Sequence, residues 1–294
     1  MPAETHQFMP ALRSKEPIAI IGIGCRFPGE AHDARSFWEI LLKGTDTIRP
    51  VPADRWNAGA YYDPDPAKPG KINNTEGGFI KDAASFDAGF FSISPAEASR
   101  MDPQQRILLE VAYHTLEDAG IPLERFSGTP TGVYIGISTQ DYASTLLAST
   151  DNRRQINSHS ATALAHSIAA NRLSFFFNLS GPSLAVDTAC SSSHNALHLA
   201  CHSLRRGESV MALAGGINLL LHPAYHMAFS RGGYLSPDAR CRAFDSGANG
   251  YVRSEGAGLV LLKPLTSALR DKNRIYALIT GTASNHDGKT PTLT

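Results

Sequence analysis

The stretch Val186-Asp187-Thr188-Ala189-Cys190-Ser191-Ser192-Ser193 determines the architecture expected for this chain of 294 residues. A strand is predicted over residues 183–187, the chain then turns through small residues, and a helix is predicted over residues 191–206. The apolar positions of this helix form one stripe at helical spacing, so the helix should pack against a core. They are Ala196, Leu197, Ala200, Cys201 and Leu204. A strand that leads through a tight turn into a packed helix is typical of layered α/β proteins.

Strands and helices also alternate on both sides of this stretch. Residues 17–24 are apolar and rich in isoleucine, as expected of a strand that is covered on both faces. Further strands are predicted over residues 131–138, 210–221, 258–262 and 275–283, and helices over residues 34–43, 103–119, 160–173 and 265–270. Residues 49–91 are proline-rich and irregular, and so long an excursion usually serves function or an interface. The order of the elements predicts a layered α/β fold.

The charge balance excludes two classes of protein. The chain has 27 Lys and Arg residues against 27 Asp and Glu residues, whereas nucleic-acid binders and proteins of acidic membranes need a basic excess. No apolar run approaches the ~18 residues of a membrane span, and the N-terminus has no apolar region of the signal-peptide kind. We therefore expect a cytoplasmic globular protein, with residues 1–15 as a flexible tail.

Several familiar binding motifs are excluded by their spacing. Gly22 and Gly24 follow a strand, but Phe27 stands where a dinucleotide-binding motif needs its third glycine. The segment Gly288-Lys289-Thr290 is similar to the end of a phosphate-binding loop, yet Ala283 stands in place of the first glycine. The 4 cysteines are far apart and the 11 histidines form no metal-binding pair. The sequence therefore predicts neither a disulfide framework nor a metal site.

Cys190 is the candidate for nucleophilic chemistry. Its sulfur is expected at a helix N-terminus, where free backbone N–H groups and the helix dipole favour the thiolate. The small neighbouring residues leave room for a bulky electrophile, so a thioester could form on the sulfur. The alternative is a buried structural cysteine in a tight turn, which periodicity alone favours. Cys25, Cys201 and Cys241 are interpreted as structural.

The residues alone identify no general base for Cys190. His286 follows a predicted strand and is one candidate. Four further histidines lie on helical segments, where a solvated or hydrogen-bonded histidine is the commoner outcome. They are His159, His166, His194 and His198. The choice among them stays open at this point.

A series of motifs in a fixed order carries a resemblance to a known family. Besides Asp187-Thr188-Ala189-Cys190-Ser191-Ser192-Ser193, it includes Ile20-Ile21-Gly22-Ile23-Gly24-Cys25-Arg26-Phe27-Pro28-Gly29, Phe37-Trp38 with Leu41-Leu42, Pro52-Ala53-Asp54-Arg55-Trp56, Phe90-Phe91-x-Ile93-Ser94-Pro95-x-Glu97-Ala98, Met101-Asp102-Pro103-Gln104-Gln105-Arg106, Cys241-Arg242-Ala243-Phe244-Asp245 and Ser254-Glu255-Gly256-Ala257-Gly258. The chain resembles the ketosynthase domain of type I polyketide synthases and animal-type fatty-acid synthases, in the β-ketoacyl synthase family. A thiolase or a ketoacyl synthase of the initiating type also places a cysteine at a helix start, but the motifs at residues 101–106 and 241–245 weigh against both.

The resemblance implies a fold, a reaction and partners. The fold is the thiolase-like layered α/β/α/β/α arrangement, usually as a homodimer. The reaction is a decarboxylative Claisen condensation, in which Cys190 takes an acyl chain from an acyl carrier protein and a malonyl-type unit on a carrier protein then attacks the thioester. No cofactor is bound directly, because phosphopantetheine arrives on the carrier domain. Neighbouring synthase domains, an acyltransferase among them, are further implied partners.

Two departures from the family pattern bear on activity. The family uses two histidines with its cysteine, in Glu-Ala-His-Gly-Thr-Gly-Thr and Asn-x-Gly-His motifs, and neither motif occurs here. His286 matches a different family segment, and His194 stands where an apolar or small residue is expected. We therefore expect residues 16–258 to form the N-terminal half of a ketosynthase and residues 259–294 to begin an incomplete C-terminal half. An inactive fragment with only structural or partner-binding capacity is the alternative.

Overall fold

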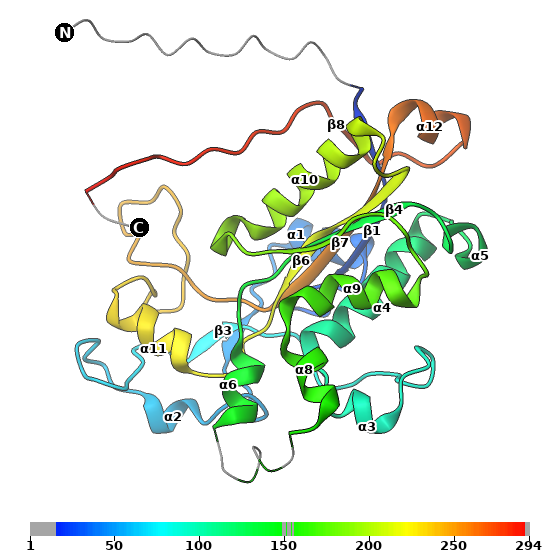
Figure 1. The fold of residues 1–294 in the computed structure, drawn as a ribbon. Helices are drawn as coiled ribbons and strands as arrows, with labels where there is room; N and C mark the ends of the chain where they lie inside the picture. The colour runs from blue at the N-terminus through cyan, green and yellow to red at the C-terminus, as the bar shows by residue number, and fades with distance from the viewer. Residues whose placement is uncertain (1–15, 149–150, 152–153, 155, 292–294) are drawn as a thin grey trace, which may run out of the picture.

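A six-stranded mixed sheet forms the centre of the molecule (Figure 1). The computed structural model describes residues 16–148, 151, 154 and 156–291, so the tail expected at residues 1–15 lies outside the described residues. The strands, in their order across the sheet, are β5 (Ser183–Val186), β4 (Thr131–Gly136), β6 (Met211–Asn218), β7 (Gly256–Pro264), β1 (Ile18–Arg26) and β8 (Ala277–Ile279). β4 runs parallel to β5 and β6, whereas β7 is antiparallel to both β6 and β1.

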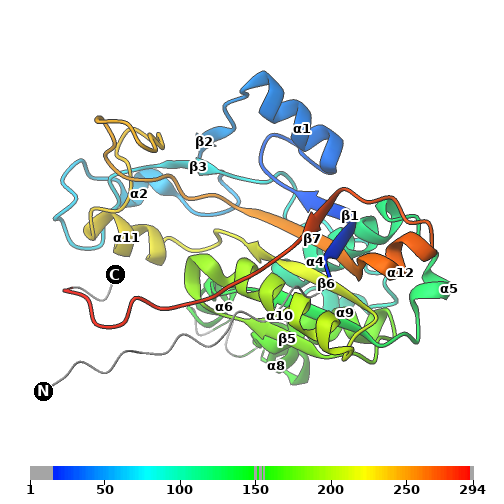
Figure 2. The same cartoon turned by 90° about the horizontal axis from the view of Figure 1, so that it is seen from above.

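Helices cover both faces of this sheet (Figure 2). α4 (Pro103–Asp118) and α9 (His166–Phe176) pack on one face, and α10 (Ser192–Arg206) packs on the other. Successive side chains of a strand point to opposite faces, so the core divides into two clusters. Within β4, Val133 and Ile135 belong to the cluster under α4, and Tyr134 belongs to the cluster under α10. The predicted layered α/β class is confirmed, and the six-stranded sheet lies between two helical layers.

Two helices follow their local capping signals. Asp33 caps α1 (Ala34–Lys43) through the Ser36 backbone, and Gly44 ends it with φ 57°. Asp102 caps α4, with Pro103 in the first turn. The remaining elements are β2 (Ile48–Pro50), α2 (Ala58–Tyr61), β3 (Glu76–Gly78), α3 (Pro95–Ala98), α5 (Leu123–Phe126), α6 (Asp141–Leu147), α8 (Ser158–Leu164), α11 (Ala224–Arg231) and α12 (Leu265–Arg270). Residues 49–91 thus hold β2, α2 and β3 within a mostly irregular path.

Three elements differ from the sequence prediction. The helix expected over 160–173 is two helices, α8 and α9, because Ala165 between them has an extended backbone with ψ 124°. β6 ends at Asn218 instead of Leu221, since the backbone N–H of Leu221 donates to an Asp141 carboxylate oxygen and leaves the ladder. The strand expected over 275–283 is reduced to β8, which pairs with residues 18–20 only.

The C-terminal part of the chain completes this same sheet. The boundary expected between residues 258 and 259 falls inside β7, which pairs with β6 on one side and β1 on the other. β8 then joins the far edge of β1. Residues 259–279 therefore pack with the N-terminal elements. Among the described residues, no helix has both the length and the apolar character needed to cross a membrane.

Candidate active site

The turn that carries Cys190 is held in a strained but well-bonded conformation. Cys190 lies in a single 3₁₀ turn (Ala189–Ser191) between β5 and α10. Ala189 has φ 54°, a left-handed value that disfavours residues with a Cβ. The Ala189 N–H donates to Asp187 Oδ1 at 3.0 Å, and the Thr188 N–H donates to Ser192 Oγ at 2.9 Å. These bonds hold the turn sharply bent, and the Cys190 side chain is exposed at its tip.

Asn195 clamps the same turn from the first part of α10. Its Nδ2 donates to Thr188 Oγ1 at 2.9 Å and to the Ser191 carbonyl at 3.3 Å. Ser284 Oγ in turn donates to Asn195 Oδ1 at 2.8 Å. Asn195 therefore links both sides of the cysteine to the C-terminal segment. Sequence reasoning missed this residue, although an amide one helical turn after Ser191 could have indicated a hydrogen bond to the turn.

Two glycines let the start of α10 approach the sheet. A Cβ on Gly136, at the end of β4, would overlap the Ser193 backbone nitrogen. A Cβ on Gly216, in β6, would lie 3.0 Å from the Ser193 Cβ. Side chains at either position would push the helix N-terminus outward. The glycines thus keep the Cys190 turn close to the ends of β4 and β6.

Cys190 opens into a cavity of about 710 Å³. Its walls come from the turn, the ends of β4 and β6, α11, and the segment before β7. The aromatic side chains on its walls include Tyr225 and Phe229 from α11 and Tyr251, with Arg253 beside them. The cavity is therefore partly aromatic, carries one buried cation, and is large enough for an acyl chain.

The candidate histidines lie outside the residues described as lining this cavity. His166 contacts a lining residue: its Nε2 lies 3.2 Å from the carbonyl oxygen of Thr139. His198 Nδ1 lies 2.8 Å from Thr282 Oγ1. His286 is exposed, and its Nδ1 accepts the Gly288 N–H at 2.9 Å. His159 is half-buried on α8, and His194 is exposed on α10. The structure thus brings none of these five imidazoles into the described lining.

The other cysteines have different surroundings. Cys25 and Cys201 are buried, and burial raises the pKa of both thiols, that of Cys25 to about 11. Cys241 is exposed, and its sulfur accepts the Val252 N–H at 3.2 Å. Burial thus disfavours the thiolate at Cys25 and Cys201. Cys241 is the accessible thiol against which Cys190 has to be distinguished.

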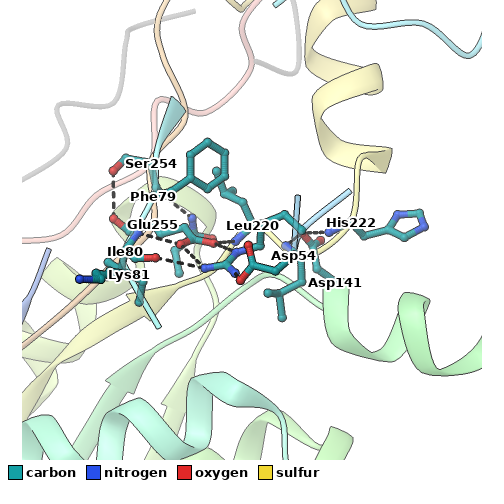
Figure 3. A network of polar contacts seen from close by, with 12 residues as sticks. Asp54, Phe79, Ile80, Lys81, Asp141, Leu220, His222, Ser254 and Glu255 are labelled. Atoms are coloured by element: carbon teal, nitrogen blue, oxygen red, sulfur yellow. Dashed lines mark hydrogen bonds and ion pairs between the residues drawn. The ribbon is translucent and has the colours of Figure 1, made fainter. Parts of the chain in front are cut away.

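A buried ion pair, whose Glu255 is one of the residues that line the cavity, joins two of the sequence motifs. Glu255 Oε1 lies 2.8 Å from Arg55 Nε, and the two side chains are 0% and 3% exposed. The same carboxylate accepts the backbone N–H groups of Ile80 and Leu220 (Figure 3). One side chain therefore ties residues 49–91 to β7 and to the segment after β6. Both motifs are visible in the sequence, but their pairing is not, because they are 200 residues apart.

His226 is a buried histidine that contacts the guanidinium of Arg253. Arg253 Nη1 lies 3.0 Å from His226 Nδ1, and the Trp56 ring packs edge-on against the imidazole with centroids 5.0 Å apart. Burial, with a smaller contribution from the Arg253 charge, lowers the pKa of His226 from 6.5 to about 3. The imidazole is therefore an acceptor for Arg253 at neutral pH.

We expect His226 to make the protein less stable in acid. Its pKa is lower in the folded chain than in the unfolded chain, so the unfolded chain takes up the proton first as the pH falls below about 6.5. Stability that is present above that pH is lost towards pH 3, by about 2 kcal/mol between pH 7 and pH 5. Urea unfolding of the wild type and of His226→Gln at both pH values measures this. If the free energy of unfolding fell by the same amount in both proteins between pH 7 and pH 5, His226 would not be the cause of the loss.

Comparisons with known proteins match this arrangement. Residues 15–268 match the family model "Beta-ketoacyl synthase, N-terminal domain". The chain is 52% identical over 274 residues to one protein of the phenolphthiocerol/phthiocerol polyketide synthase of Mycobacterium tuberculosis, a match that covers 93% of this chain and 18% of that protein. It is 50% identical to another protein of the phenolphthiocerol/phthiocerol polyketide synthase, from Mycobacterium bovis, over 95% of this chain and 15% of that protein.

Solved structures show the same likeness. An oxazolomycin ketosynthase domain from Streptomyces albus superposes with a TM-score of 0.88 at 42% identity, over 94% of this chain and 47% of that one. The ketosynthase from module 6 of the bacillaene synthase of Bacillus subtilis gives 0.84 at 40% identity, over 95% and 45%. The chain spans about half of these structures and less than a fifth of the curated relatives. It belongs to the β-ketoacyl synthase family, as the N-terminal portion of a ketosynthase domain of type I polyketide synthases.

Proposed function

We propose that this chain forms the acyl-accepting part of a polyketide ketosynthase and that Cys190 is its nucleophile. One observation carries the proposal: an exposed sulfur at the start of α10 opens into a cavity of about 710 Å³. The free backbone N–H groups at the start of a helix stabilise both a thiolate and the oxyanion that forms when it attacks a thioester. A sulfur in this place can accept an acyl group and hold it inside the molecule.

The acyl transfer balances with the groups that the proposal names. The Cys190 thiolate attacks the carbonyl carbon of an acyl thioester, which the phosphopantetheine arm of an acyl carrier protein delivers as substrate. A new carbon–sulfur bond forms at Cys190, the old carbon–sulfur bond breaks, and the leaving thiolate takes up the proton that Cys190 released. The hydrogen bonds of Asp187, Thr188 and Asn195 keep the attacking sulfur in place during both steps.

The condensation step is proposed for the complete ketosynthase. There, a malonyl-type unit on a carrier protein loses carbon dioxide and the resulting carbanion attacks the Cys190 thioester. The family's two histidine motifs do not occur in the 294 residues, and the described cavity lining contains no histidine. These observations favour acylation without condensation for the chain by itself. Its relatives are modules of large multidomain synthases, so we propose carrier and acyltransferase domains as partners, in a cytoplasmic homodimer.

Incubation with a radiolabelled acyl pantetheine thioester tests this function. We expect one label per chain, located by peptide mapping on the peptide that holds Cys190 and not on the one that holds the exposed Cys241. A malonyl thioester added to the acylated chain should release no carbon dioxide, whereas a full-length ketosynthase run in parallel should release it. A label on Cys241 alone, or none, would contradict the proposal, and malonyl-dependent condensation would show that the histidine motifs are not required.

A further inference from the structure

Arg253 is an unusual group for the wall of an acyl cavity. It lies in the cavity that Cys190 opens into, yet only 7% of the residue is exposed. Its guanidinium sits over the rings of Tyr225 and Phe229, 5.6 and 5.3 Å from their centroids. Cation–π contacts of this kind are stronger where water is excluded. The two rings therefore fix the orientation of the guanidinium inside the cavity wall.

The hydrogen-bonding capacity of Arg253 is mostly unused. Among the described residues, its guanidinium bonds to His226 Nδ1 alone, which is a neutral acceptor. Asp141 acts on it electrostatically, but one oxygen of that carboxylate accepts the N–H groups of Leu221 and His222. No carboxylate of the described residues is within ion-pair distance of Arg253. A guanidinium has five N–H donors, so several remain for a ligand.

Burial without an anionic partner is costly for this cation. Removal of a charge from water is repaid only by good geometry and by further hydrogen bonds. The effect is visible in the pKa of Arg253, which burial lowers from its usual value. A ligand that supplies an oxygen acceptor would satisfy the free donors. The cavity is thus better matched to an oxygen-bearing ligand than to a plain hydrocarbon chain.

Cys190, Tyr251 and Arg253 line the same cavity. An acyl group attached to Cys190 shares this cavity with the Tyr225, Phe229 and Arg253 side chains. The rings offer contact to the hydrocarbon part of such a chain, and the guanidinium offers donors to a polar substituent.

We propose that Arg253 is a specificity-determining residue that binds an oxygen acceptor on the acyl chain carried by Cys190. The substrate class is then an acyl thioester with a hydroxyl, carbonyl or carboxylate oxygen on its chain, in preference to the saturated analogue of equal length. This inference rests on the proposed function, because it needs the acyl group on Cys190. Sites built to hydrogen-bond a substrate oxygen reject the analogue that lacks it, since the donors are then left unpaired.

The test compares matched pairs of pantetheine thioesters on the 294-residue chain. Second-order rate constants for acylation of Cys190 are measured for 3-hydroxybutyryl, succinyl and butyryl thioesters. We expect the oxygen-bearing substrates to react roughly 10- to 100-fold faster than butyryl with the wild type. Arg253→Met should bring this ratio close to one, and Arg253→Lys should give an intermediate ratio. Arg106→Met, which removes a half-buried guanidinium outside the cavity lining, should retain the wild-type ratio.

Each result bears on one of the two proposals. If Cys190 is acylated but the wild type shows equal rates, the role of Arg253 is wrong and the proposed function stands. If no thioester acylates Cys190, the proposed function itself fails. In a separate experiment, malonyl pantetheine is added as a competitor of acylation, because its carboxylate is the other possible ligand of Arg253. If Arg253→Met abolished the competition by malonyl pantetheine but kept the wild-type ratio of oxygen-bearing to butyryl rates, Arg253 would bind the malonyl carboxylate and not the acyl chain. If Arg253→Met does not fold, the wild-type and Arg253→Lys ratios decide.

Discussion

Glu255→Gln is expected to lower the free energy of unfolding by about 3 kcal/mol, because it removes the buried charge that neutralises a buried guanidinium. The two Glu255 carboxylate oxygens accept from Arg55 Nε at 2.8 Å and Nη2 at 3.0 Å. They also accept the backbone N–H groups of Ile80 at 2.9 Å and Leu220 at 3.1 Å. Glutamine keeps the shape of the side chain but turns one acceptor into a donor that faces other donors. Arg55 would then retain only Asp54, a carboxylate that is 62% exposed, as a counter-ion.

Urea unfolding monitored by circular dichroism measures this loss, and Glu39→Gln is the matched control. Glu39 pairs with Arg35 on the outside of α1, where the side chains are 48% and 88% exposed. Surface pairs of this type contribute ~0.3–0.5 kcal/mol, so the control should change little. The double variant Glu255→Leu with Arg55→Met should cost less than the sum of the two single changes, because neither charge of the buried pair is left alone. Equal losses for Glu255→Gln and Glu39→Gln would contradict the role of the buried pair.

The features that sequence reasoning predicted well are those with local causes. α1 agrees with its predicted bounds because Asp33 and Gly44 are capping residues whose effect is confined to one turn. The turn at Cys190 was predicted for the same reason, since small residues follow a strand and precede an amphipathic helix. Its positive φ at Ala189 was not predicted, because it depends on the hydrogen bond to Asp187 and on the close approach that Gly136 permits.

The features that were missed depend on contacts between distant parts of the chain. Arg55 and Glu255 are polar residues in separate motifs until the fold brings them together. Tyr225 and Arg253 face the Cys190 cavity because α11 and the segment before β7 converge there, which no spacing in the sequence shows. The interruption at Ala165 has no proline or glycine signal. Tertiary packing therefore decided the walls of the site, whereas local sequence decided the position of Cys190.

Cys190→Ala is expected to reduce thioester-dependent acylation by at least about a thousandfold, because the proposed reaction forms its new bond on this sulfur. The fold should be unaffected, since the side chain is exposed and the turn is held by Asp187, Thr188 and Asn195. The buried thiols at Cys25 and Cys201 cannot replace it, as burial raises the pKa of both. Urea unfolding of the variant should therefore match the wild type while the label is lost.

Two matched cysteine variants separate a nucleophile from a merely accessible thiol. Cys241→Ala removes the other exposed sulfur and should retain the wild-type rate of acylation, as should Cys201→Ala, which removes a buried one. Iodoacetamide labelling of each variant first reports which thiols solvent can reach. If accessibility alone governed the reaction, Cys190→Ala and Cys241→Ala would each lose a similar share of the acyl label. Because only Cys190 combines exposure with a helix N-terminus and an adjoining cavity, we expect the thioester, unlike iodoacetamide, to select Cys190 over Cys241.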